Sequence, residues 1–469
     1  MNKLTLSIAG SILLSSLSFG ALLSEGQSVP KNEAVSDKMN VLLILIDDLG
    51  WQDVSYMGSG YYETPNIDTL ASQGMTFTHA YAASSVCSPT RASIMTGKYP
   101  ARLHLTDWIS GHPAPAGFDI KAPDWTKYLD TTETTLGDVF QSAGYKTASI
   151  GKWHLGSEPY FPEHNGFDVN IGGNHFGRPD SYWWPYTRGE NDTNPVPDLP
   201  GGEEGEYLTD RLTTEAITFM EENRYRPFFL YFPYYAVHTP IEGKEDLKQK
   251  YQAKDGWRGQ DDAEYAAMIE TVDTNVGRLM QALEDLDLAD NTIVVFFSDN
   301  GGLNRVTNMP DLRGAKGQEY EGGIREPLIM KVPDITTPGS NSEVPVISND
   351  FLPTLASLAG IDIGDLADEI DGLDITPLLT QSGTPDRDTL YWHYPHWHSL
   401  GGHFFGRIRK GDWVLIEYFD GRDTELYNLA NDPREQNNLA DTEPAKRDEL
   451  LNDLATWRTE VGAQMPVPR

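Results

Sequence analysis

Residues 41–50 read VLLILIDDLG, and this stretch decides the fold. The first six residues are all apolar, which is typical of a strand buried on both faces of a parallel sheet. A second run of this kind, TIVVFF at residues 292–297, continues into SDNGG. Both predicted strands therefore end in acidic, amide and glycine residues.

Helix and strand patterns alternate between these two runs. Helices are expected at residues 66–73, 135–143, 210–222 and 261–286, and strands at residues 145–150 and 228–232. Ile67, Leu70 and Ala71, for example, share one helix face between Pro65 and Gly74. The alternation predicts an α/β fold with a doubly wound, mostly parallel sheet and helices on both faces.

The pattern changes from about Arg387. Short strand patterns at residues 406–409 and 413–418 precede a helical pattern at residues 445–461. We expect a main domain over residues 39–385. Residues 386–469 should form a smaller α+β subdomain with a short antiparallel sheet and a terminal helix. Residues 190–206, rich in Asp, Glu, Pro and Gly, are expected to form a long surface loop.

The N-terminus has the pattern of an export signal. Lys3 precedes an apolar stretch at residues 4–23 that ends near the small-residue site Ser18-Phe19-Gly20. We expect a signal peptide within residues 1–26, with cleavage after residue 20 as one option. A membrane anchor is the alternative, but the uninterrupted apolar part is shorter than a bilayer span. An exported protein, periplasmic or secreted and without stable membrane insertion, is expected.

Charge and cysteine content narrow the function further. The 36 Lys and Arg residues face 70 Asp and Glu residues, giving a formal net charge of −34. Such a charge argues against a nucleic-acid or anionic-membrane partner. The single cysteine, Cys87, cannot form an internal disulfide. A buried core thiol is the simplest alternative to a reactive one.

Possible metal ligands follow the two apolar runs. Asp47 and Asp48 come directly after the first run, and Asp299 and Asn300 after the second. Ligands of open α/β sheets bind beyond the carboxyl ends of strands, and carboxylate and amide oxygens suit calcium or magnesium. Either pair alone could be a helix cap or an Asx turn. Two pairs at equivalent strand ends predict a metal site.

Cys87 lies in the segment SSVCSPTRASIMTG, residues 84–97. Ser88 can cap a helix, Pro89 suits its first turn and Gly97 can end it. Cys87 is then expected at a helix N-terminus, where free N–H groups and the helix dipole favour an oxyanion. Arg91 is one turn further on and can reach the group on Cys87. A low-pKa thiol or an ordinary capped helix are the alternatives.

The segment Cys87-Ser-Pro-Thr-Arg91, followed by Thr96-Gly97, resembles the signature of the type I sulfatases, in which the cysteine is converted to formylglycine. The accompanying motifs occur in the family's order: Asp47-Asp48, GKWHLG at 151–156, HTP at 238–240, Asp299-Asn300, and RGAKG to YEGGIREP at 313–327. The resemblance spans nearly all of the chain after the signal. It indicates the alkaline-phosphatase-like superfamily, and the chain resembles bacterial polysaccharide sulfatases.

The resemblance implies roles for these residues. Calcium would be held by Asp47, Asp48, modified Cys87, Asp299 and Asn300. Arg91, Lys152 and Lys316 would neutralise sulfate charge, and His154 would assist the formylglycine diol. His238 or Lys316 would protonate the leaving alcohol. A formylglycine-generating enzyme is implied as the maturation partner.

Sulfate ester hydrolysis explains the need for an aldehyde. A serine that attacked sulfur would leave another stable sulfate ester on the enzyme. A hydrated aldehyde has two hydroxyls, so one attacks sulfur and the other, once deprotonated, expels sulfate as the carbonyl re-forms. The expected reaction is therefore sulfate ester hydrolysis resolved by elimination.

Other interpretations remain open at this point. Each of Lys152, His154, His238 and Lys316 alone could be an ordinary structural residue, and only their joint occurrence in order indicates catalysis. A phosphatase or phosphonate-ester hydrolase of the same superfamily is the main rival, although such phosphatases use Ser or Thr and usually two zinc ions. A non-catalytic carbohydrate-binding protein on this scaffold would be expected to lack part of the catalytic set.

Substrate contacts are expected from two aromatic-rich segments, at residues 175–184 and 391–403. The second holds four of the 11 histidines, but their spacing matches no familiar zinc site. Core packing is the alternative for most of these side chains. The expected substrate-binding residues are Arg178, Trp183, His393, His396 and His403. The expected substrate is a sulfated polysaccharide or its oligosaccharides.

Overall fold

The computed structural model describes residues 38–187, 196–197, 199 and 201–469. The expected signal peptide lies outside the described residues, as does much of the expected loop at residues 190–206.

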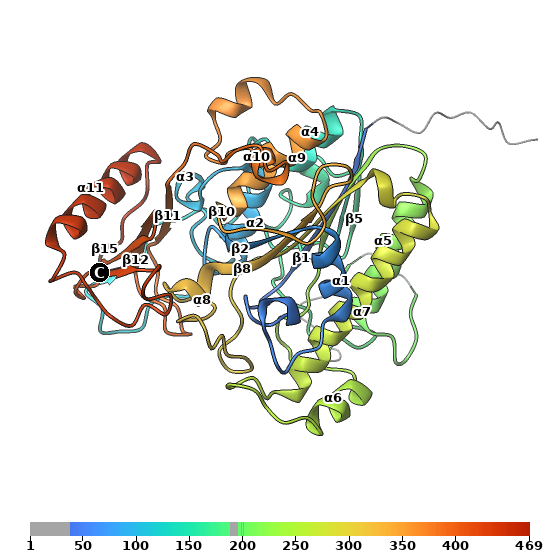
Figure 1. The fold of residues 1–469 in the computed structure, drawn as a ribbon, viewed down its shortest axis with the longest axis horizontal. Coiled ribbons are helices and arrows are strands. Elements are labelled where there is room, and N and C mark those ends of the chain that lie inside the picture. Colours follow the sequence, from blue (N-terminus) through green and yellow to red (C-terminus); the bar gives the residue numbers. More distant parts are fainter. Residues whose placement is uncertain (1–37, 188–195, 198, 200) are drawn as a thin grey trace, which may run out of the picture. The chain divides into compact units, whose positions relative to one another are not determined.

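A nine-stranded sheet forms the centre of the fold, with β1 (Asn40–Ile46) among its middle strands (Figure 1). The strand order is β10-β2-β8-β7-β1-β6-β4-β5, and β9 pairs with β2. Only β8 runs antiparallel to its neighbours in the described sheet, which confirms the mostly parallel sheet. The other strands are β2 (Met75–Tyr81), β4 (Lys146–Ile150), β5 (Val169–Ile171), β6 (Phe228–Pro233), β7 (Thr292–Ser298), β8 (Arg325–Lys331), β9 (Ser340–Ser342) and β10 (Val346–Ile347).

Helices cover both faces of this sheet because successive side chains of each buried strand point to opposite sides. Leu42 and Ile44 of β1 belong to one apolar core, and Val41 and Leu43 to the other. The first core includes α1 (Pro65–Gln73), α5 (Leu208–Glu222) and α7 (Ala263–Asp285), and α6 (Glu245–Gln252) packs on α7. The second core includes α2 (Cys87–Thr96), α4 (Leu136–Ser142), α9 (Phe351–Leu358) and α10 (Thr376–Leu379).

Local signals explain where helices begin. Thr135 caps α4, accepting a hydrogen bond from Asp138 N, and the Asp138 side chain accepts one from Thr135 N. Asp262 caps α7 by accepting hydrogen bonds from the backbone N–H groups of Glu264 and Tyr265. Each predicted helix between the two apolar runs is present within two residues of its expected bounds.

The C-terminal part forms a four-stranded antiparallel sheet with a terminal helix, as expected (Figure 1). Its elements are β11 (Thr389–Tyr394), β12 (Phe405–Lys410), β13 (Trp413–Tyr418), β14 (Glu425–Asn428) and α11 (Pro444–Glu460). Trp392 Nε1 donates to Ala82 O at 2.8 Å, and β15 (Val467–Pro468) pairs with β3 (Ile120–Lys121). The sheet is thus tied to the main α/β part. The boundary near residue 385 stays a prediction.

Two short helices, α3 (Pro100–Leu103) and α8 (Glu321–Ile324), complete the described elements apart from single turns of 3-10 helix. Among the described residues, none of the helices is both long and apolar enough to cross a membrane.

Candidate active site

The two acidic strand ends meet at one edge of the sheet. β1 and β7 pair in parallel with Ile46 opposite Ser298, so the residues that follow leave the sheet side by side. Asp48 N donates to Asp299 Oδ1 at 3.2 Å, and Asn300 Nδ2 donates to Asp48 Oδ1 at 2.8 Å. Asp47, Asp48, Asp299 and Asn300 are all buried. The structure therefore brings together both predicted ligand pairs.

Cys87 is the first residue of α2 and is buried. The expectation that Ser88 caps this helix is wrong, because Val86 occupies the N-cap position without a side-chain bond. Ser88 Oγ instead donates to His154 O at 2.9 Å and accepts from Ile109 N at 3.1 Å. Ser88 thus joins three segments of the site, and Cys87 stays in the first turn, where backbone N–H groups have no intrahelical acceptor.

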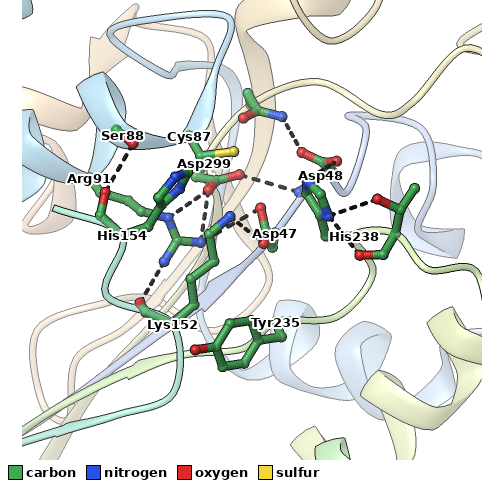
Figure 2. A network of polar contacts seen from close by, with 12 residues as sticks. Asp47, Asp48, Cys87, Ser88, Arg91, Lys152, His154, Tyr235, His238 and Asp299 are labelled. Carbon is green, nitrogen blue, oxygen red and sulfur yellow. Dashed lines mark hydrogen bonds and ion pairs between the residues drawn. The ribbon is translucent and has the colours of Figure 1, made fainter. Parts of the chain in front are cut away.

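Three buried cations pair with these carboxylates. Figure 2 shows two of them, Arg91 and Lys152. Arg91 Nε donates to Asp299 Oδ2 at 2.8 Å, and Lys152 Nζ lies 2.6 Å from Asp47 Oδ2. Lys316 Nζ lies 2.6 and 2.8 Å from the two Asp48 oxygens and 3.5 Å from Cys87 Sγ. In this geometry Lys316 contacts Cys87.

Burial and the paired charges set the protonation of these groups. Burial raises the pKa of the Cys87 thiol to about 12, although Lys152 and Lys316 oppose the shift. A thiol in this position is therefore neutral and a poor nucleophile. Burial also favours the neutral form of Asp48, but Lys316 and His238 outweigh it and hold the pKa of this carboxyl below its usual range.

His154 reaches the site from a turn of the backbone, where its φ of 60° is left-handed. The His154 ring lines the cavity beside Cys87, and its Nε2 donates to the Ile109 carbonyl. Nε2 therefore carries the proton, and Nδ1, which has no hydrogen-bond partner among the described residues, is the basic nitrogen. Burial, with help from Lys152, lowers the pKa of His154 well below its usual value.

The donor set fits a hard divalent cation. Ligand atoms of Asp47, Asp48, Cys87 and His238 all lie within 4.8 Å of one another. Two buried oxygens, Asp47 Oδ1 and Asn300 Oδ1, have no hydrogen-bond donor within the described part of the chain. Buried acceptor oxygens of this kind are the ligands that calcium prefers.

A cavity of about 690 Å³ opens onto these groups. Cys87, His154, His238, Lys316 and Arg178 of the predicted residues line it. The remaining lining residues are Trp108, Ile109, Ser110, His175, Phe176, Gly177, Thr239 and His398.

Four expected substrate-binding residues lie elsewhere, with their rings engaged by other parts of the chain. Trp183 packs edge-on against Tyr207, with ring centroids 4.8 Å apart. His393 Nε2 bonds to Gln464 O at 2.9 Å, His396 Nε2 to Thr106 Oγ1 at 2.8 Å, and His403 Nδ1 lies 3.4 Å from Asp420 Oδ2. The three histidine rings are thus engaged by these contacts. None of the four residues is among those that line the cavity in the described structure.

His398, which was not among the expected substrate-binding residues, is the histidine of the same run that lines the cavity. Residues 395–404 follow β11 as irregular loop, where no period tells which side chains share a face. The cavity is also lined by Trp108, Ile109 and Ser110, which carry no motif of their own and were not expected at the site. Bonds from Ile109 to Ser88 and His154 hold this segment at the cavity.

Comparisons with known proteins agree with this geometry. The sulfatase family model matches residues 39–361, and a model of the C-terminal part of N-sulphoglucosamine sulphohydrolase matches residues 315–460. A sulfatase of Formosa agariphila is 32% identical, with 94% of this chain and 92% of that protein covered. N-acetylgalactosamine-6-sulfatase of Homo sapiens is 32% identical, with 75% of this chain and 68% of that protein covered.

Solved structures give the same result. The crystal structure of Ps i-CgsB, also solved in complex with k-i-k-neocarrahexaose, is 31% identical with a TM-score of 0.74, covering 90% of this chain and 92% of that one. A protein solved with its substrate D-glucosamine-2-N,6-O-disulfate is 25% identical with a TM-score of 0.68, covering 91% and 98%. The chain therefore belongs to the sulfatase family of the alkaline-phosphatase-like superfamily and is a sulfuric ester hydrolase.

Proposed function

We propose that this enzyme hydrolyses sulfate esters of a sulfated polysaccharide or its oligosaccharides, with a formylglycine made from Cys87 and a bound calcium ion. One observation carries the proposal: two strand ends place buried oxygens around the first residue of α2, and Lys316 Nζ contacts both Asp48 and Cys87. A buried neutral thiol has no evident use in this position, whereas a modified side chain there would face the metal ligands.

Calcium would be held by Asp47, Asp48, Asp299, Asn300 and the modified Cys87. Bound there, it would polarise a sulfate oxygen and orient the nucleophile. Asp47, Asp48 and Asp299 are balanced by Arg91, Lys152 and Lys316, so a divalent cation would leave the site positive. A positive site suits an anionic ester even in a strongly acidic protein.

Cys87 Sγ stands where an oxygen of the modified side chain would be. Formylglycine supplies two hydroxyls, one to attack sulfur and one to release sulfate. Lys316 would stabilise the attacking oxygen and the sulfate charge. His154 would accept a proton at Nδ1, because its Nε2 proton is committed to the Ile109 carbonyl.

Lys316 and His238 are the candidates for protonating the leaving alcohol. Both line the cavity, and His238 Nε2 lies 3.6 Å from Asp48 Oδ2. Lys316 is the better candidate because it is a cation with several protons and contacts the Cys87 position directly.

Maturation requires a formylglycine-generating enzyme. Cys87 is only 2% exposed and every residue of α2 is buried, so the modifying enzyme must reach this segment before it packs. This requirement is compatible with export through a signal peptide at residues 1–26 and with a periplasmic or secreted protein, which we also propose. We retain residues 39–385 and 386–469 as the proposed catalytic domain and C-terminal subdomain.

A carbohydrate substrate is supported by the cavity and by the relatives. The cavity combines aromatic rings with polar groups, as sugar sites require. One relative is an N-acetylgalactosamine-6-sulfatase by name, and others were solved with k-i-k-neocarrahexaose or with D-glucosamine-2-N,6-O-disulfate.

The test is sulfate release from a panel of sulfated oligosaccharides by protein shown to carry formylglycine. We expect turnover with at least one sugar sulfate and none with a Cys87→Ala variant of unchanged melting temperature. Full turnover by that variant, or no sulfate release from any algal or animal oligosaccharide, would contradict the proposal.

A further inference from the structure

Among the described residues, one cation of the active-site cavity is unpaired. Lys316 is bound to Asp48, and behind the cavity wall Arg91 and Lys152 are bound to Asp299 and Asp47. Arg178 also lines the cavity, but its side chain is exposed and makes no hydrogen bond or ion pair with any residue of the described chain.

The backbone before Arg178 is held against the catalytic histidine. A Cβ on Gly177 would lie 2.6 Å from His154 Cε1, so this glycine packs directly on the imidazole. Asn174 O accepts from His154 N at 2.9 Å, and Asn174 Oδ1 accepts from Phe176 N at 2.8 Å. The segment that presents Arg178 is therefore fixed relative to the reaction centre.

The chain is anchored again just after Arg178. Ser181 Oγ and Tyr182 N both donate to Glu242 Oε2 at 2.9 Å. With anchors on both sides, the backbone holds Arg178 next to His154, and its long exposed side chain extends from there.

The cavity wall offers this guanidinium no competing negative charge. No Asp or Glu lines the cavity in the described chain, although the protein carries a formal net charge of −34. Burial lowers the pKa of His175 and lowers that of His398 to about 3, so it favours the neutral form of both rings. A free guanidinium without a competing carboxylate is a site for a second oxyanion.

We propose that Arg178 binds a second anionic group of the substrate, a sulfate or a carboxylate on the sugar next to the one that carries the scissile sulfate. This inference rests on the proposed function and narrows its substrate class to oligosaccharides with a second negative charge beside the cleaved ester.

The test compares three oligosaccharides that share the scissile sulfate and differ on the neighbouring sugar, which carries a hydroxyl, a sulfate or a carboxylate. We expect wild-type kcat/KM to be about tenfold higher for at least one of the two doubly charged substrates. The substrate that shows the gain identifies the second anion as sulfate or carboxylate.

Substitution assigns the effect to Arg178. Arg178→Gln should lose the tenfold preference, mainly through KM. Arg178→Lys should retain part of the preference. Arg224→Gln, which removes the same charge at the turn between α5 and β6, should keep all of it.

Equal kcat/KM for the three substrates in the wild type, or an undiminished preference in Arg178→Gln, would overturn the inference while leaving the proposed function intact. Failure of the proposed function has a different signature, since formylglycine-containing protein would then release sulfate from none of the substrates.

Discussion

Lys316 is the residue whose position is most informative, because its ammonium contacts both Asp48 and the Cys87 position. If it protonates the leaving alcohol, its importance must depend on the leaving group. We expect Lys316→Gln to lower kcat on a sugar sulfate by about 10²- to 10⁴-fold. The loss should be at least about tenfold smaller on 4-nitrophenyl sulfate, whose leaving group needs no proton.

His238→Gln is the matched variant for this comparison, because His238 lines the same cavity and also lies near Asp48. We expect it to lose similar factors on both substrates. The opposite result would be a loss that is smaller on 4-nitrophenyl sulfate than on the sugar sulfate for His238→Gln and equal on both for Lys316→Gln. That result would assign protonation of the leaving alcohol to His238.

Ionisation of the buried Asp107 carboxyl is expected to lower the stability of the fold as the pH rises. Its Oδ1 accepts from Tyr394 OH at 2.7 Å and from Trp108 N at 2.9 Å, yet burial raises the pKa of Asp107 to about 7. The folded carboxyl holds its proton more tightly than the unfolded one, whose pKa is near 3.8. Stability is therefore lost as the pH rises from about 4 to 7.

Asp107→Asn cannot ionise and removes this cost. Compared with wild type, this variant should gain stability at the higher pH. The difference in free energy of unfolding, variant minus wild type, should be about 2 kcal/mol larger at pH 8 than at pH 5. Urea unfolding at the two pH values measures the difference. An identical effect of the substitution at both pH values would show that Asp107 does not titrate in this range.

At the scale of elements, β12 is joined to α8 by a buried ion-pair group. Arg407 bonds to Glu321 and Glu435, and its Nη1 donates to Glu319 O at 2.8 Å. Arg407 is completely buried, and Glu319 lies three residues after Lys316. This group therefore connects the C-terminal sheet to the segment that carries Lys316.

Removing Arg407 takes away the cation that pairs with buried Glu435, and it leaves buried Glu321 with Arg325, which lies 3.5 Å away. We expect Arg407→Leu to lower the free energy of unfolding by about 3–5 kcal/mol. Arg422→Leu is the control, because the exposed Arg422 side chain pairs with Asp420 just after β13. Its effect should be below about 1 kcal/mol in the same urea titration. Equal effects of the two substitutions would contradict this view of the junction.

The sequence predicted the elements well where apolar periodicity was strong. The buried runs that became β1 and β7, and the helix patterns that became α1, α4, α5 and α7, depend on local spacing alone. The carboxyl ends of neighbouring parallel strands meet by necessity, so the sequence alone could place Asp48 and Asn300 together. The family signature added Lys152, His154 and Lys316.

The residues that line the cavity were harder to predict, for a physical reason. His398 and Trp108 lie in loops, where side-chain direction is set by distant contacts and not by a period. His393 and His396 looked equally suitable, but hydrogen bonds to Gln464 and Thr106 hold them away from the cavity. Only the tertiary structure could separate these two outcomes.

At the scale of the whole molecule, the buried acidic strand ends predict a link between calcium and stability. A ligand that binds only the folded state stabilises it, by about 2.7 kcal/mol at a concentration of 100 times Kd. We expect calcium to raise the melting temperature of chelator-treated protein. Asp47→Asn should reduce this shift, because the Asp47 Oδ1 atom is a buried oxygen without a hydrogen-bond donor in the described structure.

Asp53→Asn is the control for calcium binding. Asp53 is also buried, but its oxygens accept hydrogen bonds from Thr307, Tyr265 and Gly50 N, and it is outside the proposed ligand set. The calcium-dependent shift should persist in this variant. No shift in the wild type, or an equal shift in Asp47→Asn, would contradict the proposed calcium site.

We propose that Cys87 acts as formylglycine, and peptide mass spectrometry across residues 84–97 tests this most directly. In active protein from its own host, we expect the mass loss of conversion from thiol to aldehyde at Cys87. An unmodified Cys87 in fully active protein would contradict this proposal, because the nucleophile would then not be formylglycine.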